Sequence, residues 1–427
     1  MKTSKFKMTE LGPIPEEWEV KPFSECFTLI RNNTYARECL TDHPGSVANV
    51  HYGDVLIKYG AVLDFAKNAV PYLKSDVKPN KDMLRDGDLV FADTAEDEAV
   101  GRAVEVQGLK SCAAVAGLHT VACRPHDGLF APRYLGYYIN SATYHNQLLP
   151  LITGTKVSSV ARAGFLATYV AIPPKGEQEK IAEALSDVDE LISALGKLIE
   201  KKRNIKTGTM QELLTGKTRL PRFKGKWEEK RLGDCGFCFN GLTGKSGSDF
   251  GHGKACYITF LNVLTNVVID SSIFEPVDIC SGENQNEVRR GDIFFNTSSE
   301  TPEEVGLCAV LEEDVKSVYL NSFCFGFRIT DNDVSGRFLA YWFRASAGRA
   351  LMTSLAQGST RYNLSKDAFR EACVCIPPTL AEQKAIAAVL SDMDAEIAAL
   401  EADRAKYERI KSGMMQELLT GKTRLEA

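Results

Sequence analysis

The sequence lacks the features that mark a membrane protein or a common enzyme. No apolar run approaches the roughly 18 residues that a membrane span needs, and no apolar stretch follows the basic N-terminus as it does in a signal peptide. The GxGxxG, GxSxG and HExxH motifs of dinucleotide-binding proteins, hydrolases and zinc proteases are absent from it. We therefore expect a cytoplasmic protein that binds its partners and does not itself catalyse a reaction.

Metal-binding and nucleotide-binding patterns are also missing. Most of the 12 cysteines lie in strand-like apolar contexts, where a free thiol behaves as a small hydrophobic group. Cys235 and Cys238 form a CxxC pair, but neither a second pair nor suitably spaced histidines accompany it. Residues 244–246 read Gly-Lys-Ser, as at the end of a P-loop, yet Phe239 stands where that motif needs a glycine. Neither a zinc site nor a nucleotide site is therefore predicted.

An overall excess of positive charge is lacking too, since the net charge is −5. This argues weakly against a nucleic-acid partner, but the distribution of the charges matters more than their sum. Residues 201–231 carry eleven Lys and Arg against three Glu. This basic strip is either a solvated connector or a surface that faces phosphates.

What the chain does contain is an internal repeat. The eleven residues Met-Gln-Glu-Leu-Leu-Thr-Gly-Lys-Thr-Arg-Leu occupy positions 210–220 and return at positions 415–425, at an offset of 205. Upstream, the Ile-Pro-Pro and Glu-Gln of residues 172–178 return within residues 376–383. A duplication of this kind decides the architecture. The chain is one module written twice, and the copies agree closely at their ends and poorly in their middles.

Each copy opens with a strand-rich region and closes with a long helix. Short apolar runs bounded by turn residues predict strands within residues 15–172 and 226–376, with helical patches between them. After the double proline, apolar residues recur at steps of four and three, the period of a coiled-coil seam. The two helices either pair with each other or lie on their own domains. They are expected to end near Gly216 and Gly421, because glycine readily takes the left-handed conformation. The apolar positions are Ile181, Leu185, Val188, Ile192, Leu195 and Ile199 in the first copy, and Ile386, Leu390, Met393, Ile397 and Leu400 in the second.

The copies are similar in their helices and different in their strand-rich regions, which indicates two functions. The matching helices perform one structural task twice, for example the docking of two copies of the same partner. Asp187 and Asp189 recur on these helices as Asp392 and Asp394, and a solvated face or a partner contact explains them better than acid–base catalysis. The divergent domains recognise two different things. A bipartite, non-palindromic DNA sequence fits this arrangement, with each domain contacting one half-site.

These residues resemble the specificity (S) subunit of type I restriction-modification systems over essentially the full length of the chain. The most specific marks are the Ile-Pro-Pro and Glu-Gln segment before each helix and the eleven-residue repeat after it. Gly-Asp-Leu at 87–89, Gly-Asp-Ile at 291–293, and the glycine loops at Gly154 and Gly358 add support. The resemblance implies two target recognition domains separated by two antiparallel helices. It also implies recruitment of two methyltransferase (modification) subunits and of restriction subunits. No catalytic residue or cofactor is implied here, because S-adenosylmethionine, ATP and Mg²⁺ belong to those partners.

We therefore expect an α+β fold with two strand-rich target recognition domains in tandem repeat, each followed by a long helix, the two helices pairing as an antiparallel coiled coil. The first recognition domain is assigned to residues 1–172, the first spacer helix to 173–216, the linker and second recognition domain to 217–376, and the second spacer helix with the C-terminal tail to 377–427. The expected function is sequence-specific DNA recognition within a restriction system. The alternatives are a non-enzymatic scaffold with two divergent protein-binding domains, and a nuclease with an unrecognised carboxylate site.

The family pattern points to loops of each recognition domain as the DNA readers. Polar and basic loop residues are expected to reach base edges or phosphates, and about half of the candidates should do so, because loop Asn, Ser and Thr often only cap turns. One loop of the first domain is acidic, through Asp93, Glu96, Asp97 and Glu98, which either accept from cytosine N4 or face away. The candidates are Asn32, Asn33, Thr34, Tyr35, Thr94, Lys156, Ser158, Ser159 and Arg162 in the first domain, and Thr243, Lys245, Asn296, Thr297, Ser298, Arg361, Tyr362, Asn363 and Lys366 in the second.

Overall fold

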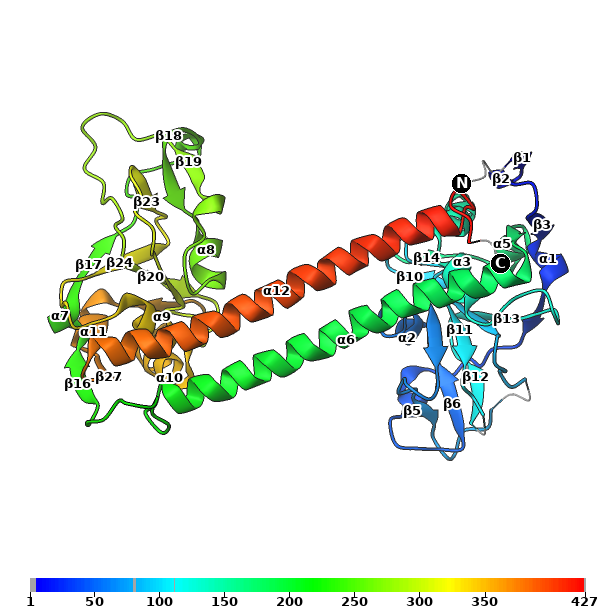
Figure 1. Ribbon diagram of the computed structural model, residues 1–427, viewed down its shortest axis with the longest axis horizontal. Coiled ribbons are helices and arrows are strands. Elements are labelled where there is room, and N and C mark those ends of the chain that lie inside the picture. The colour runs from blue at the N-terminus through cyan, green and yellow to red at the C-terminus, as the bar shows by residue number, and fades with distance from the viewer. Residues whose placement is uncertain (1–4, 80–81, 111, 426–427) are drawn as a thin grey trace. The chain divides into compact units, whose positions relative to one another are not determined.

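The computed structural model describes residues 5–79, 82–110 and 112–425 (Figure 1). The chain divides into two compact units, one made of residues 1–196 with 402–427 and the other of residues 197–401. Each unit therefore contains one strand-rich region and a part of both long helices. Among the described residues, no helix is both long enough and apolar enough to cross a membrane.

A five-stranded sheet forms the centre of the first unit. Its strands lie in the order β4 (Phe27–Ile30), β13 (Thr120–Pro125), β9 (Leu89–Ala92), β11 (Ala103–Gln107) and β7 (Val62–Asp64). Neighbouring strands are antiparallel except β11 and β7. Along β9, Leu89 and Phe91 enter one buried cluster, and Val90 and Ala92 enter another. This strand is apolar throughout because alternate side chains point to opposite faces and both faces are covered.

Among its described residues, the first unit also contains a second sheet, three strand pairs and five short α-helices. The sheet has the order β12 (Ala113–Ala116), β6 (Val47–Val50), β8 (Tyr72–Leu73) and β5 (Leu40–Thr41). The pairs are β1 (Phe6–Thr9) with β2 (Gly12–Pro15), β3 (Glu19–Pro22) with β15 (Tyr169–Ile172), and β10 (Thr94–Ala95) with β14 (Ser158–Ser159). The helices are α1 (Phe23–Cys26), α2 (Tyr52–Ile57), α3 (Tyr134–Ile139), α4 (Ala142–Leu148) and α5 (Arg162–Leu166).

The second unit repeats this plan. Its central sheet has the order β17 (Gly236–Asn240), β24 (Cys324–Ile329), β20 (Ile293–Asn296) and β22 (Cys308–Val310), which matches β4, β13, β9 and β11 of the first unit. Along β20, Ile293 and Phe295 enter one buried cluster and Phe294 enters another, as along β9. The two copies of the module therefore share a framework despite their different sequences.

The remaining elements of the second unit also have counterparts in the first. A three-stranded sheet contains β19 (Glu275–Val277), β18 (Phe250–Ile258) and β23 (Val318–Leu320), and a smaller one contains β21 (Ser298–Ser299), β26 (Tyr362–Leu364) and β25 (Ala356–Gln357). Strand β16 (Glu228–Arg231) pairs with β27 (Cys373–Ile376). The helices are α7 (Leu232–Cys235), α8 (Phe260–Thr265), α9 (Gly336–Arg344), α10 (Ser346–Leu355) and α11 (Lys366–Glu371).

The two long helices are α6 (Lys175–Leu213) and α12 (Leu380–Leu418), each 39 residues long. They pack together in antiparallel orientation, as expected. Residues that come later in α6 pair with residues that come earlier in α12. Both end just before a glycine in the left-handed conformation, Gly216 at φ 71° and Gly421 at φ 68°, as the sequence predicts. The ion pairs that join the helices include Asp189–Lys411 in the first unit, and Lys202–Glu396 and Lys206–Asp394 in the second.

The predicted seam serves two kinds of contact. Leu185 belongs to the buried core of the first unit and Leu390 to that of the second. Farther along the helices, Ile199 and Ile397 are buried away from those two cores. The first turns of each helix thus lie on their own strand-rich region together with the end of the other helix, since Leu418 shares the core of Leu185 and Leu213 shares that of Leu390. Both interpretations of the heptad pattern therefore apply.

Each eleven-residue repeat packs against the other copy of the module. Leu213 and Leu214, near the end of α6, join the core of the second unit. Leu418 and Leu419, near the end of α12, join the core of the first unit. The C-terminal segment of the chain is therefore a structural part of the N-terminal domain.

Ion pairs fix both of these crossed contacts. In the first unit the Glu177 carboxylate accepts from Arg424 at 2.6 and 2.8 Å and from the Trp18 indole at 3.0 Å. In the second unit Glu382 accepts from Arg219 at 2.5 and 2.7 Å. Both carboxylates are buried, so a paired guanidinium is needed to offset the loss of hydration. The repeated Glu and Arg are thereby explained by the fold.

Candidate nucleic-acid interface

In the first unit, candidate residues from three separate loops come together. Strand pairing places Thr94 of β10 opposite Ser159 of β14, beside Ser158. The Arg162 guanidinium, at the first position of α5, donates to the Asn32 side-chain oxygen at 2.6 Å. These contacts bring the candidate segments around residues 32, 94 and 158–162 to one place.

The second unit assembles an equivalent cluster with different side chains. Ser298 of β21 lies opposite Asn363 of β26, and the Arg361 guanidinium donates to the Ser298 hydroxyl at 3.2 Å. Lys366, at the first position of α11, donates to the side-chain oxygen of Asn240. This contact repeats the one between Arg162 and Asn32 of the first unit. A shared frame thus presents two different sets of polar groups.

Two residues of this frame are not among the candidates that the sequence predicts. Asn240 ends β17 and receives the Lys366 ammonium, and the strand register places it at the position of Arg31 in the first unit, one residue before Asn32. Val157 is an exposed apolar residue that stands where Arg361 stands in the other unit. In each unit a glycine turn approaches the carbonyl of that residue so closely that a Cβ would lie 2.0 or 2.1 Å from it. Gly154 and Gly358, both at positive φ, therefore shape matching loops around unlike side chains.

The remaining candidates of the first unit differ in exposure. Thr34 and Lys156 are exposed. Tyr35 is half-buried, and its hydroxyl donates to the Lys78 carbonyl at 2.8 Å, which fastens this loop. Asn33 is 3% exposed, and its backbone N–H donates to the Ala116 carbonyl at 2.7 Å. A structural role accounts for Asn33.

In the second unit, Asn296 and Thr297 precede Ser298 and are held by hydrogen bonds to other loops. Asn296 is fully buried, and its amide donates to the Glu304 carbonyl at 3.1 Å. Thr297 is half-buried, and its backbone N–H donates to the Phe323 carbonyl at 2.9 Å. Tyr362 is half-buried and Asn363 exposed. The exposed candidates are therefore Arg361 and Asn363, and Ser298 and Tyr362 beside them are half-buried.

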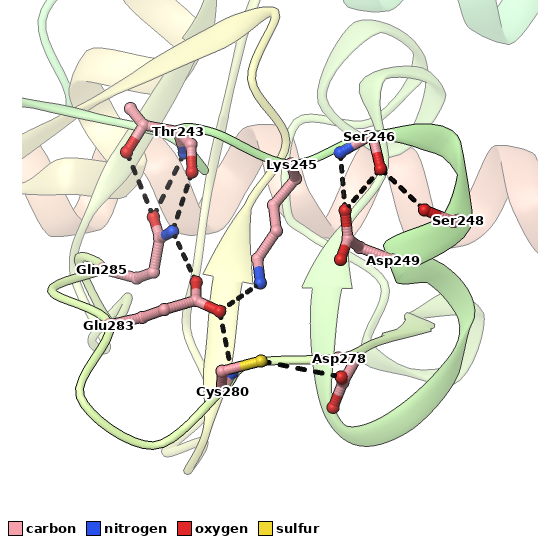
Figure 2. Close-up of polar contacts among 9 residues, drawn as sticks. All are labelled: Thr243, Lys245, Ser246, Ser248, Asp249, Asp278, Cys280, Glu283 and Gln285. Atoms are coloured by element: carbon pink, nitrogen blue, oxygen red, sulfur yellow. Dashed lines mark hydrogen bonds and ion pairs between the residues drawn. The ribbon is translucent and has the colours of Figure 1, made fainter.

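Thr243 and Lys245 belong to a closed network of loop contacts, drawn in Figure 2. The Lys245 side chain is 5% exposed and donates to Glu283 at 2.6 Å. Glu283 also accepts from Gln285, whose own amide holds the backbone of Thr243. Hydrogen bonds from Lys245, from Gln285 and from the Cys280 N–H lower the pKa of Glu283 to about 2. Lys245 thus enters an ion pair that joins two loops, which leaves its charge neutralised.

The acidic loop of the first domain lies beside Thr94. The Asp93 carboxylate accepts from the Thr94 hydroxyl at 2.8 Å and lies 3.7 Å from the His119 ring nitrogen. Glu96, Asp97 and Glu98 are exposed. The far end of this loop therefore presents carboxylates to solvent, which disfavours phosphate contact at that end.

The basic strip of residues 201–231 is largely neutralised within the protein. Six of its eleven cations pair with carboxylates, which favours a structural role over a phosphate-facing surface. The pairs are Lys202–Glu396, Arg203–Glu401, Lys206–Asp394, Arg219–Glu382, Lys230–Asp331 and Arg231–Glu371.

The recurring aspartates of the long helices have the same structural character. Asp189 accepts from the Tyr137 hydroxyl at 2.9 Å and pairs with Lys411 at 2.6 Å. Asp394 accepts from the Tyr341 hydroxyl at 2.7 Å and also pairs with a lysine. Burial raises the pKa of both tyrosines. These aspartates join helix to domain within each unit.

Metal chemistry finds no support in the described ranges. Across residues 5–79, 82–110 and 112–425, no three His, Cys, Asp or Glu side chains are grouped as a metal site requires. Cys235 is buried and Cys238 partly so, and burial raises the pKa of both thiols. Since the thiolate is the metal-binding form, this environment disfavours ligation.

Comparison with known proteins gives a consistent result. The family model for the type I restriction modification DNA specificity domain matches the chain twice, over residues 15–204 and 224–411. A putative type I restriction enzyme MjaX specificity subunit of Methanocaldococcus jannaschii is 25% identical, over 100% of this chain and 98% of that protein. The EcoKI specificity subunit of Escherichia coli (strain K12) is 22% identical, over 86% of this chain and 80% of that protein.

Solved structures agree with this at the level of the fold. The S subunit of a type I restriction-modification system from M. genitalium has a TM-score of 0.57 at 15% identity, covering 97% of this chain and 98% of that one. A chain from a study of complex assembly and conformational transition of the type I R-M system has a TM-score of 0.56 at 16% identity, covering 96% and 99%.

Proposed function

The chain belongs to the family of type I restriction-modification DNA specificity proteins, and we propose that it reads a bipartite, asymmetric DNA sequence, one half-site for each recognition domain. As a specificity subunit it supplies recognition and is itself non-catalytic. Methylation, ATP-driven translocation and cleavage are carried by partner subunits. The proposed partners are double-stranded DNA, two methyltransferase subunits and restriction subunits, in the cytoplasm.

One observation carries the proposal. Each unit gathers polar side chains from three distant loops onto the same frame, and the side chains differ between the units at equivalent positions. Val157 of one unit stands where Arg361 stands in the other, and Ser159 where Asn363 stands. A chain that read one sequence twice would present the same groups twice. Unlike groups on a common frame favour an asymmetric site, because base edges are distinguished by their donors, acceptors and methyl groups.

Burial and internal hydrogen bonds narrow the proposed contact set to exposed or half-exposed groups on the shared frame. Asn33 and Asn296 are excluded because they are buried, and Thr243, Thr297 and Lys245 because their hydrogen bonds hold the loops together. The proposed DNA contacts are Asn32, Thr34, Thr94, Lys156, Ser158, Ser159 and Arg162 in the first domain, and Ser298, Arg361, Tyr362, Asn363 and Lys366 in the second. Tyr35 fastens its loop and is proposed to contribute only its exposed edge.

The repeated helices support the proposal of two methyltransferase subunits. Residues 177–215 and 382–420 have nearly the same sequence at their ends, but the Leu-Leu pairs within them are already buried in the protein. A partner is therefore proposed to bind the exposed polar faces of the repeats. A measured stoichiometry of one methyltransferase per chain, with both helices intact, would count against this.

The direct test is methylome sequencing of host cells with and without this chain, with its methyltransferase present in both. We expect a two-part motif that disappears with the chain. Full methylation of the same motif without the chain would overturn the proposal. If the motif is absent in both, salt-dependent DNA binding by the purified complex separates DNA recognition from a protein-binding scaffold.

Two substitutions, Arg361→Ala in the second domain and Arg162→Ala in the first, then assign the domains to half-sites. Each variant serves as the control for the other. Arg361→Ala should weaken binding by roughly 1–3 kcal/mol if this side chain pairs bidentately with guanine, and less if it meets only phosphate. Its effect should be confined to base changes in one half-site, and that of Arg162→Ala to the other. Binding by duplexes with single base changes measures this. Loss of discrimination in both half-sites from one substitution would show that the domains do not read independently.

A further inference from the structure

Phe323 is the most exposed of the phenylalanine, tyrosine and tryptophan residues in the described part of the chain, at 61%. It occupies the turn between β23 and β24 of the second unit. Large apolar side chains are usually buried, because exposing them to water is unfavourable. The exposed phenyl ring therefore does not stabilise the isolated fold, which favours a role in binding.

The backbone of Phe323 is held firmly although its ring is free. Its N–H donates to the Asn321 side-chain oxygen at 2.9 Å, and its carbonyl accepts from the Thr297 N–H at 2.9 Å. Asn321 is itself buried, and its amide donates to the Ile258 carbonyl at 3.1 Å. Three parts of the second unit thus fix the point from which the ring projects. A rigid backbone beneath an exposed side chain is characteristic of recognition sites, because little conformational entropy of the loop is then lost on binding.

The turn adjoins the proposed reading cluster. Thr297, which holds the Phe323 carbonyl, directly precedes Ser298, and Ser298 accepts from Arg361 at 3.2 Å. The Leu364 N–H donates to the Thr297 carbonyl at 2.9 Å, which ties the β26 strand to the same point. Phe323 is therefore an apolar group at the edge of a cluster of polar ones.

The first unit places a different ring at the equivalent point. The carbonyl of His119 accepts from the Asp93 N–H at 3.1 Å, just as that of Phe323 accepts from Thr297. The His119 ring lies 3.5 Å from the Thr94 hydroxyl and 5.3 Å from the Tyr52 ring. Both domains thus present a ring beside their reading strand, one with hydrogen-bonding nitrogens and one without.

We infer that Phe323 is a specificity-determining residue that contacts the 5-methyl group of a thymine in the half-site read by the second domain. This inference rests on the proposed function. A phenyl ring neither donates nor accepts a conventional hydrogen bond, so it distinguishes base edges only by apolar contact. In the major groove the thymine methyl is the apolar base-edge group, and phenylalanine is among the side chains that contact it. The imidazole of His119 gives the first domain a different preference at the matching position.

The test uses the specificity subunit in complex with its methyltransferase and duplexes that carry the methylated motif. Each thymine of the motif is replaced in turn by deoxyuridine, which keeps the base pair and removes only the methyl group. Binding by the wild-type complex should weaken about four-fold at one position, the factor expected for one buried methyl group. In the Phe323→Ala complex that same replacement should have no further effect, and in Phe323→Leu the sensitivity should persist.

Phe237→Ala is the matched control, because Phe237 is a second exposed phenylalanine of the same unit, on β17. It should retain full sensitivity to deoxyuridine. Three results would each overturn the inference. The Phe323→Ala complex could remain sensitive to deoxyuridine, the wild-type complex could be insensitive at every thymine, or the half-site could contain no thymine. Altered DNA bending in Phe323→Ala without coupling to the methyl group would overturn it in favour of a wedge between base steps. If the proposed function itself were wrong, the wild-type complex would show no preference for the motif over unrelated duplexes.

Discussion

Glu105 is a carboxylate in an almost fully buried position of the first unit, held by neutral donors. It accepts from the backbone N–H groups of Arg133 and Gly136 at 2.5 and 2.9 Å and from the Gln107 amide at 2.7 Å. Burial raises the pKa of Glu105 to about 7, although these hydrogen bonds oppose the shift. Arg133 begins helix α3 with a left-handed backbone at φ 70°. The carboxylate therefore satisfies N–H groups that the helix start leaves without partners.

This shift predicts a stability that falls as pH rises. The carboxyl group binds its proton more tightly in the folded protein than in the unfolded chain, where its pKa is about 4.5. Its contribution is fully present below pH 4.5 and is lost as pH rises through about 7, by up to roughly 3 kcal/mol. Glu105→Gln should remove this dependence. Hydrogen exchange of β11 amides in urea, measured between pH 5 and 8, compares the variant with the wild type.

The exposed Glu98 of the same unit provides the control. Glu98→Gln should leave the pH dependence of the wild type in place. A difference between wild type and Glu105→Gln that stays constant over this pH range would contradict the prediction, even if the variant were destabilised overall.

At the scale of elements, the most informative feature is the crossed packing of the two repeats. The end of α12 completes the first unit and the end of α6 completes the second. Arg424 and Arg219 each neutralise a buried glutamate on the start of the other long helix. Removing one partner of a buried ion pair leaves an uncompensated charge, which costs more than the pair contributes.

Substitution of these arginines should therefore act on the opposite copy of the module. Arg424→Ala should destabilise the first unit by about 3–5 kcal/mol and leave the second unit unchanged, although residue 424 belongs to the second copy of the sequence. Arg219→Ala should do the reverse. Hydrogen exchange resolved by unit measures both effects, and each variant is the control for the other. Loss of hydrogen-exchange protection in the second unit from Arg424→Ala, or in the first unit from Arg219→Ala, would contradict the crossed packing.

The sequence predicted the local parts of this arrangement and missed the crossing. Val47–Val50 is a strand as expected, and Gly216 and Gly421 take the left-handed conformation that ends each helix. These features depend on neighbouring residues, whose periodicity and turn chemistry are readable. The contact between Glu177 and Arg424 joins residues 247 positions apart. No local pattern specifies which copy a repeat will pack against.

The candidate site shows the same division. Pairing of β10 with β14 gathers Thr94 and Ser159, which loop position alone suggested. Lys245 had the chemistry of a phosphate contact, but Glu283, 38 positions away, encloses it in an ion pair. The sequence predicts Asn296 to be an accessible loop amide, but it is fully buried. Residue type predicts what a side chain is able to bind, whereas its partner within the fold decides whether it is available.

At the scale of the whole molecule, the long helices link the two reading functions. At 1.5 Å per residue, a helix of 39 residues is roughly 58 Å long, between one and two turns of DNA at about 34 Å each. We predict that the paired helices act as a ruler that sets the spacer between the half-sites. Within each unit, ion pairs join α6 to α12.

Lengthening both helices tests the ruler. One heptad inserted after residue 196 of α6 and one after residue 401 of α12 keeps the seam in phase, whereas three or four residues would introduce a stammer or stutter. A heptad adds about 10 Å, which corresponds to about three base pairs at roughly 3.4 Å each. Methylome sequencing should then report unchanged half-sites separated by a spacer about three base pairs longer. The added base pairs also rotate one half-site by about 100° around the duplex, given roughly 10.5 base pairs per turn. Loss of methylation is therefore the other outcome that a rigid ruler allows. Full methylation of the original motif, with its spacer unchanged, would show that the helices do not set the distance.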